Sequence, residues 1–211
     1  MAELTASIFE VAALSYSYPG SRNGISEMTF NAVGGKITAI VGDSGSGKST
    51  LLACLGGVLT PQRGNMRILD AHGGARLVRS SIVTQSATLF EKLNVWENVA
   101  VAWGSPRRSL RRRACGILEE FGVAHLANAH PSEVSFGQRQ RVAIASAVAG
   151  NTEVVLADEP TGGLDADNAN RVAAALRAAA DGDRVVIVVT HDDRIAAVAD
   201  HVIRIENGHI S

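Results

Sequence analysis

The chain has 211 residues, of which 46% are hydrophobic and 19% charged, and its formal net charge is −1. This length supports one substantial core, and the composition is that of a folded globular protein, which excludes a disordered chain. Taken as a whole, so small a net charge gives no reason to expect nucleic acid or an anionic membrane as a partner.

The cysteines and the apolar runs limit where the protein works. Cys54 and Cys115 match no metal-ligand spacing, and we expect both to be reduced, buried thiols in a cytosolic protein. The first residues carry Glu3 and lack a basic segment before an apolar run, so no signal peptide is expected. No stretch reaches the roughly 18 consecutive apolar residues of a membrane helix. Membrane association is therefore expected to come through a partner.

Short strands separated by turns are predicted in the first third of the chain. The predicted strands are Ile8–Leu14, Met28–Asn31, Ile37–Val41, Met66–Leu69 and Ser81–Thr84. A helix is predicted to begin near Lys48. The stretch Val95–Phe121 has few β-branched runs and is predicted to be helical.

Helices and strands alternate in the last third. The predicted order is helix Gly137–Ala149, strand Val154–Ala157, helix Ala166–Ala180, strand Arg184–Val189, helix Asp193–Val198 and strand Val202–Ile205. Continuous apolar strands such as Val185–Val189 are typical of a sheet covered on both faces. The sequence therefore predicts an α/β fold with a mainly parallel core sheet.

A glycine-rich segment follows the predicted strand Ile37–Val41. Residues 42–49 read G-D-S-G-S-G-K-S and fit the pattern G-x-x-x-x-G-K-[ST]. Glycines let successive backbone N–H groups face one anion, and the next helix adds its positive end. An incidental glycine-rich turn is the weaker alternative. The residues expected to bind a nucleotide here are Gly42, Ser44, Gly45, Ser46, Gly47, Lys48, Ser49 and Thr50.

Specific roles follow for several polar side chains of this site. Lys48 is expected to reach the β- and γ-phosphates, and the Ser49 hydroxyl to ligate Mg²⁺. Two acids end the apolar strand Val154–Ala157: Asp158 would hold Mg²⁺ through water, and Glu159 would orient or deprotonate the attacking water. Alone, the two acids could be a helix-capping turn, but the phosphate loop favours the nucleotide site.

The segment before the predicted helix at Gly137 carries a family resemblance. Residues 134–138 read V-S-F-G-Q and resemble the LSGGQ signature motif of ABC ATPases. Gln85 matches the Q-loop glutamine of that family, and residues 163–165 match its D-loop. His191 matches its switch histidine. Tyr18 matches the aromatic residue that stacks on adenine, with Tyr16 as the less favoured alternative.

The resemblance covers nearly the whole chain. It implies the P-loop NTPase fold of ABC ATPases as a single domain over residues 1–211, with an N-terminal antiparallel β subdomain and a helical signature subdomain at roughly 86–150. It also implies ATP and Mg²⁺ as cofactors and a head-to-tail dimer with a second copy of the subunit. Each ATP would lie between the phosphate loop of one subunit and the signature of the other.

The resemblance also implies which residues act. Ser135 would offer a hydroxyl and Gly137 a backbone N–H to the γ-phosphate, with the helix dipole behind them. The residues expected at the nucleotide also include Gln138 and Asp165; the expected catalytic residues are Glu159, His191, Lys48 and Gln85, and the expected Mg²⁺ ligands are Ser49, Gln85 and Asp158. As isolated residues, Gln85 would be unremarkable and His191 structural. Only the family pattern favours their functional roles.

Several residues depart from the pattern or lie outside it. Phe136 stands where the family usually has glycine, but Ser135 and Gly137 are kept, so activity is expected to survive. Four histidines match nothing and are expected to be surface or packing residues: His125, His130, His201 and His209. A cluster of arginines reads as a solvated helix face, with anionic lipid or a partner loop as the alternative: Arg107, Arg108, Arg111, Arg112 and Arg113.

The family resemblance and the length of the chain also indicate a physiological role. ABC ATPases that act outside transport usually carry two ATPase units in one chain, or long coiled-coil or zinc insertions. This chain has room for neither, and it ends soon after the last predicted strand. We therefore expect a peripheral subunit on the cytoplasmic face of the cell membrane. Its expected partners are integral-membrane permease subunits, which would dock near Ser86–Val99, and no nucleic acid.

Residues 89–99 and 157–165 resemble the group that serves lipoprotein release, macrolide and peptide efflux, haem export and cell division. One hypothesis is an exporter ATPase for a hydrophobic or amphiphilic substrate. The other is a regulator that activates a cell-wall hydrolase through a membrane partner. A P-loop kinase or GTPase would not explain Ser135–Gln138 or His191.

Overall fold

Two β-sheets and several helices make up the structure, a computed structural model that describes residues 6–20, 23–70, 74–150 and 152–211. Within these residues the larger sheet has six strands in the order β10-β9-β3-β8-β7-β6. Its strands are β3 (Ile37–Val41), β6 (Ser80–Val83), β7 (Val154–Asp158), β8 (Val185–Val189), β9 (His201–Glu206) and β10 (His209–Ile210). Neighbouring strands are parallel except for β10, which pairs antiparallel with β9.

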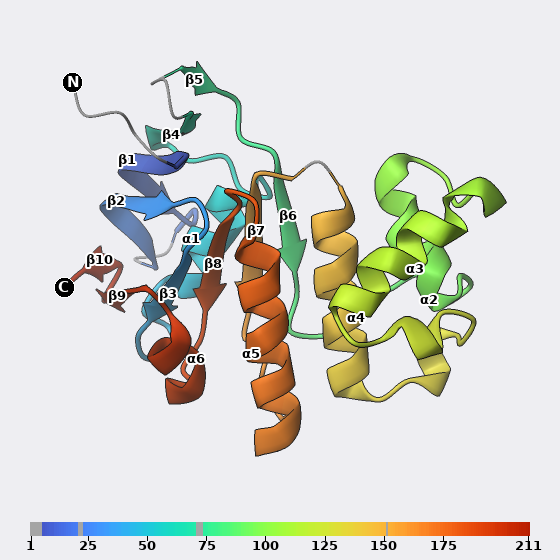
Figure 1. Ribbon diagram of the computed structural model, residues 1–211. Helices are drawn as coiled ribbons and strands as arrows, with labels where there is room; N and C mark the ends of the chain where they lie inside the picture. The colour runs from blue at the N-terminus through green and yellow to red at the C-terminus, as the bar shows by residue number, and fades with distance from the viewer. Residues whose placement is uncertain (1–5, 21–22, 71–73, 151) are drawn as a thin grey trace.

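The smaller sheet is antiparallel and covers one side of the larger one. Its order is β2-β1-β4-β5 within the described part of the chain. Its strands are β1 (Ile8–Ser17), β2 (Gly24–Val33), β4 (Arg63–Leu69) and β5 (Ala75–Arg76). Helix α1 (Lys48–Leu55) packs against β2, β7 and β8, and so lies between the two sheets (Figure 1).

The remaining helices lie on the other side of the large sheet or beyond it. Helices α5 (Ala166–Ala180) and α6 (Asp193–Val198) contact β3, and α5 also contacts β8. Helix α4 (Phe136–Ala149) contacts α5 and β6 on one side and α2 (Val95–Ala100) and α3 (Arg111–Glu120) on the other. Short 3₁₀ turns occur at Val101–Trp103, Arg108–Leu110, Ala124–Leu126 and Pro131–Glu133. In Figure 1, α2, α3 and the turns around them form a helical lobe beside the sheets.

Local sequence explains these elements. All five residues of β8 are buried, as expected for a strand covered on both faces. Side chains cap four of the helices: Asn94 and Ser135 form capping boxes at α2 and α4, and Asp165 and Asp192 cap α5 and α6. Among the described residues no helix is both long enough and apolar enough to cross a membrane.

The predicted fold class is confirmed: the structure is α/β with a mainly parallel sheet, an antiparallel sheet and a helical lobe. The sequence underestimated β1 and β2, which extend to Ser17 and begin at Gly24, and it missed the two-residue strands β5 and β10. One expectation was wrong. Cys54 is buried, which raises the pKa of its thiol to about 11, but Cys115 is only half-buried because it lies at the side of the exposed helix α3.

Candidate nucleotide-binding site

Many of the predicted site residues lie at one edge of the large sheet. Strands β3, β8 and β7 are parallel neighbours, so their carboxyl ends meet at the same edge. There β3 leads into the loop that carries Lys48, β7 ends at Asp158, and β8 is followed by His191. Crevices at the carboxyl ends of parallel strands are the usual place for ligands in α/β folds.

The phosphate loop has the backbone shape that its glycines predict. Gly47 is the N-cap of α1 with φ 106°, a conformation that side chains disfavour. The Lys48 ammonium donates to the carbonyl oxygens of Gly42 at 2.7 Å and Asp43 at 2.8 Å, which holds the side chain across the loop. Lys48 is only 8% exposed, whereas Ser49 is exposed at the start of the helix. The loop therefore presents backbone N–H groups, an ammonium and hydroxyls together.

Residues from both ends of the chain support this loop, a feature that the sequence did not reveal. The N–H of Gly208 donates to the Ser46 carbonyl at 2.9 Å, and the N–H of Ser26 donates to the Gly208 carbonyl at 2.8 Å. A Cβ on Gly47 would lie 2.9 Å from the Gly24 carbonyl oxygen, and one on Gly208 would lie 2.8 Å from it. Backbone segments more than 160 residues apart therefore meet beneath the loop.

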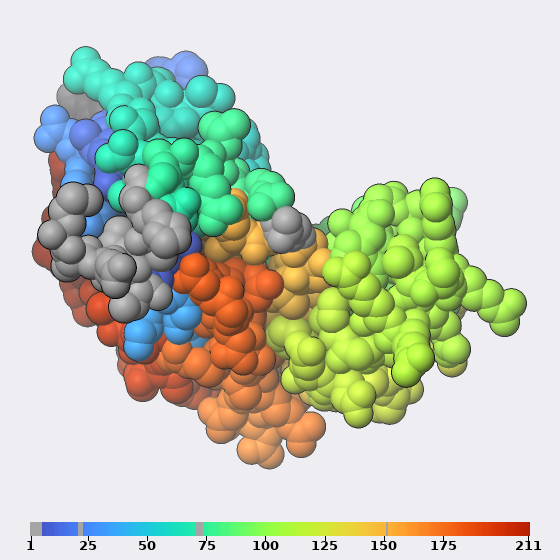
Figure 2. Space-filling view, turned by 45° about the horizontal axis from the view of Figure 1, so that its top comes forward, coloured from blue at the N-terminus to red at the C-terminus, as the bar shows by residue number. Residues whose placement is uncertain are grey.

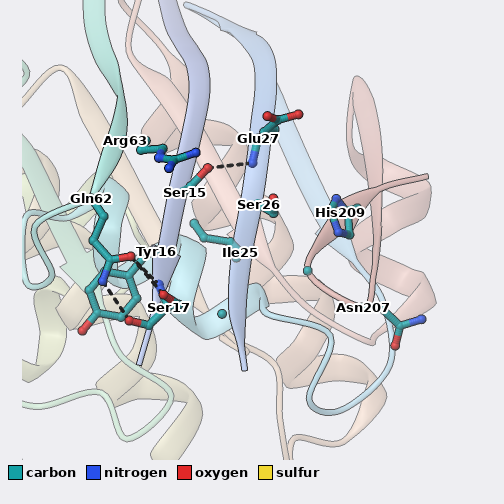
Figure 3. Close-up of a pocket in the computed structure, with 12 residues that line it drawn as sticks. Ser15, Tyr16, Ser17, Ile25, Ser26, Glu27, Gln62, Arg63, Asn207 and His209 are labelled. Carbon is teal, nitrogen blue, oxygen red and sulfur yellow. Dashed lines mark hydrogen bonds between the residues drawn. The ribbon is translucent and has the colours of Figure 1, made fainter. Parts of the chain in front are cut away.

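A cavity of about 360 Å³ lies beside this contact, between β1, β2 and the β9–β10 turn. Figure 3 shows its polar lining, in which the Glu27 N–H donates to Ser15 Oγ and the Ser17 N–H to Gln62 Oε1. These bonds hold β1 to β2 and β1 to the segment before β4. The cavity lies beside the strand end from which Tyr18 projects.

Tyr18 is the residue that the family resemblance assigns to stacking on adenine. It follows the end of β1, is 40% exposed, and its hydroxyl lies 3.5 Å from Thr50 Oγ1 in the first turn of α1. Tyr16 meets it edge-on, with ring centroids 5.1 Å apart, and packs partly against the core. Tyr18 is thus the more exposed of the two rings, while Tyr16 lines the cavity beside it.

The acidic pair at the end of β7 has two distinct environments. Burial raises the pKa of Asp158, the charge of Glu159 raises it further, and Lys48 opposes both effects. Glu159 adopts a left-handed backbone conformation with φ 44°, the kind of strain that clusters at functional sites. Its carboxylate accepts from Thr190 Oγ1 at 3.2 Å and lies 2.8 Å from His191 Nδ1. The structure therefore brings Glu159 and His191 into direct contact.

Gln85 reaches the same edge from β6. A Cβ on Gly162, in the turn after Glu159, would lie 3.2 Å from Gln85 Nε2. The backbone of Gln85 is held from α4, because Gln140 Nε2 donates to its carbonyl oxygen at 2.7 Å. Gln140 is fully buried and was missed by sequence reasoning, because it stands in the polar run Gln138–Arg141, which gives no sign that one amide is buried. Gln140 thus links the helix after the signature to the Q-loop glutamine.

Asp192 is a second residue that the sequence analysis did not single out. Its carboxylate accepts from Thr161 Oγ1 at 2.7 Å and from the Arg194 guanidinium at 2.8 to 3.1 Å. Hydrogen bonds from Arg194 are the main reason that its pKa falls to about 2. Asp192 therefore ties the turn after β7 to the segment after β8, on either side of the Glu159–His191 contact.

The signature segment lies apart, at the start of α4. Ser135 Oγ accepts from the Gln138 N–H at 3.3 Å, and Gln138 Oε1 accepts from the Ser135 N–H at 2.8 Å. Phe136 is 39% exposed. A Cβ on Gly137 would lie 3.2 Å from the Asn168 side chain, so glycine here also permits close packing of α4 against α5. In the described residues no hydrogen bond joins this segment to the phosphate loop of the same chain.

Asp165 is the residue predicted for the D-loop. It is the N-cap of α5, and its carboxylate accepts from the Asn168 N–H at 2.8 Å and from the Asn168 amide at 3.0 Å. These bonds from Asn168 lower its pKa. Since Asn168 also packs over Gly137, the predicted D-loop and signature residues are neighbours in one chain.

The predicted metal ligands suit a Mg²⁺ ion bound together with a nucleotide better than a metal ion bound by protein side chains alone. Ser49, Gln85 and Asp158 offer a hydroxyl, an amide and one carboxylate, which are hard oxygen ligands. No group of three or more His, Cys, Asp or Glu side chains that could hold a metal occurs in the described ranges. Mg²⁺ is usually bound by one or two carboxylates together with substrate phosphates, so these residues fit a nucleotide-dependent magnesium site.

Comparisons with known proteins agree with this geometry. The profile of the ABC transporter family matches residues 25–162. An uncharacterised ABC transporter ATP-binding protein of Mycobacterium tuberculosis is 38% identical over 193 residues, which cover 86% of this chain and 58% of that protein. The macrolide export ATP-binding/permease protein MacB of Photorhabdus laumondii is 34% identical over 218 residues, covering 96% of this chain and 34% of MacB. The chain thus spans less than two thirds of these relatives.

Solved structures give the same result. The dimeric ATP-binding cassette MJ0796, in a post-hydrolysis state bound to ADP and Pi, superposes with a TM-score of 0.78 at 27% identity and 96% coverage of both chains. The cbiO1 protein of Clostridium perfringens, part of the ABC transporter complex cbiONQ, gives a TM-score of 0.82 at 30% identity, covering 98% of this chain and 87% of cbiO1. With motifs, geometry and relatives in agreement, this chain is an ATP-binding domain of the ABC transporter family.

Proposed function

We propose that this chain binds and hydrolyses ATP as the nucleotide-binding subunit of an ABC transporter. The observation that carries the proposal is the meeting of Lys48, Glu159 and His191 at the ends of three neighbouring parallel strands. Lys48 lies in a loop built for phosphate. The Glu159–His191 contact supplies a carboxylate next to an imidazole at the same edge.

The residues have separable roles in this proposal. The phosphate loop and Lys48 bind and orient the phosphates. Ser49, Gln85 and Asp158 would hold Mg²⁺, which neutralises phosphate charge when bound. Glu159 accepts the proton of the attacking water through its carboxylate.

His191 would contact the γ-phosphate. Its Nδ1 is engaged by Glu159, while the side chain as a whole is 74% exposed. The Nε2 edge is therefore the part of the ring left free for a phosphate oxygen.

The second half of the site is proposed to come from another copy of the chain. Ser135, Gly137 and the start of α4 form a site suited to phosphate, but they belong to the helical lobe and share no hydrogen bond with the phosphate loop in the described residues. A head-to-tail dimer would bring them to the partner's nucleotide. The dimeric state of the similar MJ0796 cassette supports this arrangement.

A groove on the helical lobe is the proposed docking site for a separate permease. It has a volume of about 350 Å³ and is lined by parts of β6, α2 and α4 together with Thr88, Leu89 and Phe90. Phe90 is 60% exposed, and its backbone N–H donates to the buried Asn98 side chain at 2.7 Å, so the loop presents an apolar side chain on a fixed backbone. A helix of an integral-membrane partner fits such a groove. The subunit would then lie on the cytoplasmic face of the membrane.

The transported substrate is proposed only as a class. Likeness to MacB, a macrolide export protein, supports export or extraction of a hydrophobic or amphiphilic molecule such as a lipoprotein, macrolide, peptide or haem. The alternative is a regulator of cell-wall hydrolysis or cell division that uses the same ATP-driven motion through a membrane partner. The partner, rather than this chain, would decide between them.

Phosphate release from ATP by the purified chain tests the proposal. Wild type should release phosphate in a Mg²⁺-dependent manner. Lys48→Ala should lose most of its affinity for ATP, while Lys36→Ala, which removes a distant surface lysine bonded to Asp200, should leave turnover unchanged. Turnover that survives in Lys48→Ala, or that is equally lost in Lys36→Ala, would exclude this site as its source.

A further inference from the structure

Five exposed arginines lie within seven residues at the beginning of α3. This arginine patch consists of Arg107, Arg108, Arg111, Arg112 and Arg113. None of the ion pairs in the described residues includes a member of the patch. No acidic residue occurs in sequence between Glu97 and Glu119. The patch therefore has no counter-charge from its own segment.

The position of the patch on its helix is also unfavourable in the isolated chain. Helix α3 begins at Arg111, and its first turn holds three arginines and no acid. The first turn is the positive end of a helix, where cations are disfavoured and anions favoured. Like charges so close together also repel one another. An external anion would relieve both effects.

An indole ring and a cavity adjoin the patch. The Arg113 guanidinium lies over the ring of Trp103, 4.3 Å from its centroid. A cavity of about 480 Å³ beside them is lined by Trp103, Gly104, Ser105, Arg107, Ser109 and Leu110. Guanidinium and hydroxyl groups are strong donors to phosphate oxygens, and an indole suits the boundary between polar headgroups and apolar chains. This combination matches a phospholipid better than a free anion.

The spread of the charges favours a surface over a single acidic side chain. Consecutive residues of a helix point about 100° apart, so Arg111, Arg112 and Arg113 fan out over several directions. Figure 2 shows that the yellow-green lobe at the right, which contains α3, stands out from the body of the molecule. Along the chain, Trp103 directly follows Val101 and Ala102, which line the proposed permease groove.

We propose that the arginine patch binds anionic phospholipid headgroups of the membrane beside the permease. Those guanidinium groups of the patch that face the bilayer would donate to phosphodiester oxygens, and Trp103 would lie at headgroup depth. The contact would add to the permease contact and orient the helical lobe towards the bilayer. Only this orientation rests on the proposed function; lipid binding itself needs neither a permease nor ATP.

Co-sedimentation of the full chain with vesicles tests the proposal. One set of vesicles contains only phosphatidylcholine, and the other an equimolar mixture of phosphatidylcholine and phosphatidylglycerol. The chain should sediment with the mixed vesicles and not with the neutral ones, and added salt should weaken the binding because exposed charges are screened. No preference for the mixed vesicles would overturn the proposal.

A pair of double variants separates the patch from net charge. Arg107→Ser with Arg108→Ser should weaken binding to mixed vesicles on the order of 20-fold, since each basic residue near an anionic surface contributes about fivefold. Arg63→Ser with Arg204→Ser removes the same charge from exposed sites elsewhere and should bind as wild type does. Equal weakening in both pairs, or none in the first, would contradict the assignment.

Two further measurements distinguish lipid binding from the binding of an acidic protein segment and from the proposed ATPase function. If a poly-glutamate peptide binds wild type while mixed vesicles do not, an acidic protein segment replaces the lipid and the proposal falls. The Arg107→Ser, Arg108→Ser variant should hydrolyse ATP at the wild-type rate. Vesicle binding by a chain that shows no ATP turnover would refute the proposed function and leave the lipid contact standing.

Discussion

The Nδ1 atom of His191 lies 2.8 Å from Oε1 of Glu159, and the backbone N–H of His191 donates to Oε2 of the same carboxylate at 3.3 Å. A carboxylate beside Nδ1 fixes the tautomer and the orientation of an imidazole. The two side chains therefore behave as one unit, and a change in Glu159 should also alter how His191 is held.

The first prediction is that Glu159→Gln separates ATP binding from hydrolysis. Glutamine keeps the shape of the side chain but cannot take the proton of water, so turnover should fall by about 10²–10⁴. Binding should persist because Lys48 and Ser49 are unchanged, and a closed dimer should accumulate. Phosphate release and size-exclusion chromatography with ATP and Mg²⁺ measure both effects. As a control, Lys48→Ala should form no such dimer. Near-normal hydrolysis in Glu159→Gln would contradict the role of the Glu159 carboxylate as general base.

Phe136 is predicted to be dispensable for catalysis. Its ring is partly exposed at the first residue of α4, and Ser135 and Gly137 carry the proposed phosphate contacts. Phe136→Gly should therefore leave ATP turnover within about tenfold of wild type, or about 1.4 kcal/mol in activation free energy. Ser135→Arg should abolish turnover by blocking the facing phosphate. A collapse in Phe136→Gly, with thermal unfolding unchanged, would show that the ring itself contributes to the site.

Gln140 is predicted to position Gln85 through its amide hydrogen bond. Gln140→Glu and Gln140→Leu both lose the donor, so the Gln85 backbone should be held less firmly and kcat should fall by up to about tenfold, the worth of one hydrogen bond. KM for ATP should change little because the phosphate loop is untouched. Arg139→Gln, which only breaks the surface ion pair with Glu91, serves as the control. A change confined to KM would argue against a positioning role.

The predicted roles of contiguous motifs came readily from sequence, whereas contacts between distant segments did not. The conformations of residues 42–49 and 154–159 can be predicted from the local sequence. The spacing of the glycines, and the apolar strand that ends in two acids, are patterns among residues close together in the chain. Gln140 gave little signal, because its partner Gln85 lies 55 positions earlier. Likewise, no local pattern indicates that Gly208 donates to Ser46.

Chain ends and short elements were also hard to predict for a physical reason. Strands β5 and β10 have two residues each and exist only through pairing with β4 and β9. The exposure of Cys115 depends on how α3 rests on its neighbours, which residue type cannot reveal.

The carboxylate of Asp192 should make stability depend on acid pH. Hydrogen bonds from Arg194 are the main cause that lowers its pKa from 3.8 to about 2. A carboxyl whose folded pKa is lowered stabilises the fold above its unfolded pKa, and this contribution disappears as pH falls through the folded value. At pH 7, Asp192→Asn should lower the free energy of unfolding by up to about 2 kcal/mol, and the gap should close between about pH 4 and pH 2. Urea unfolding over this range measures it; a gap independent of pH would contradict the argument.

Cross-linking should capture the permease at the groove on the helical lobe. In a background with Cys115→Ala, cysteine at Phe90, which lines the groove, or at Glu97 in the adjacent helix α2 should cross-link to a permease produced together with this chain. Arg204→Cys, on an exposed strand of the large sheet, is the matched control. Capture from Arg204→Cys, with none from Phe90→Cys or Glu97→Cys, would place the docking site elsewhere.

The contact of Gly208 and Gly24 beneath the phosphate loop has a consequence for biosynthesis. A ribosome makes residue 49 long before residue 208, and early segments begin to fold first. The loop obtains its bond from the Gly208 N–H to Ser46 only when the β9–β10 turn has docked. A nascent chain therefore carries the whole G-x-x-x-x-G-K-[ST] motif without its final support. The loop therefore reaches its final shape only after the turn at 207–208 has been synthesised and packed against it.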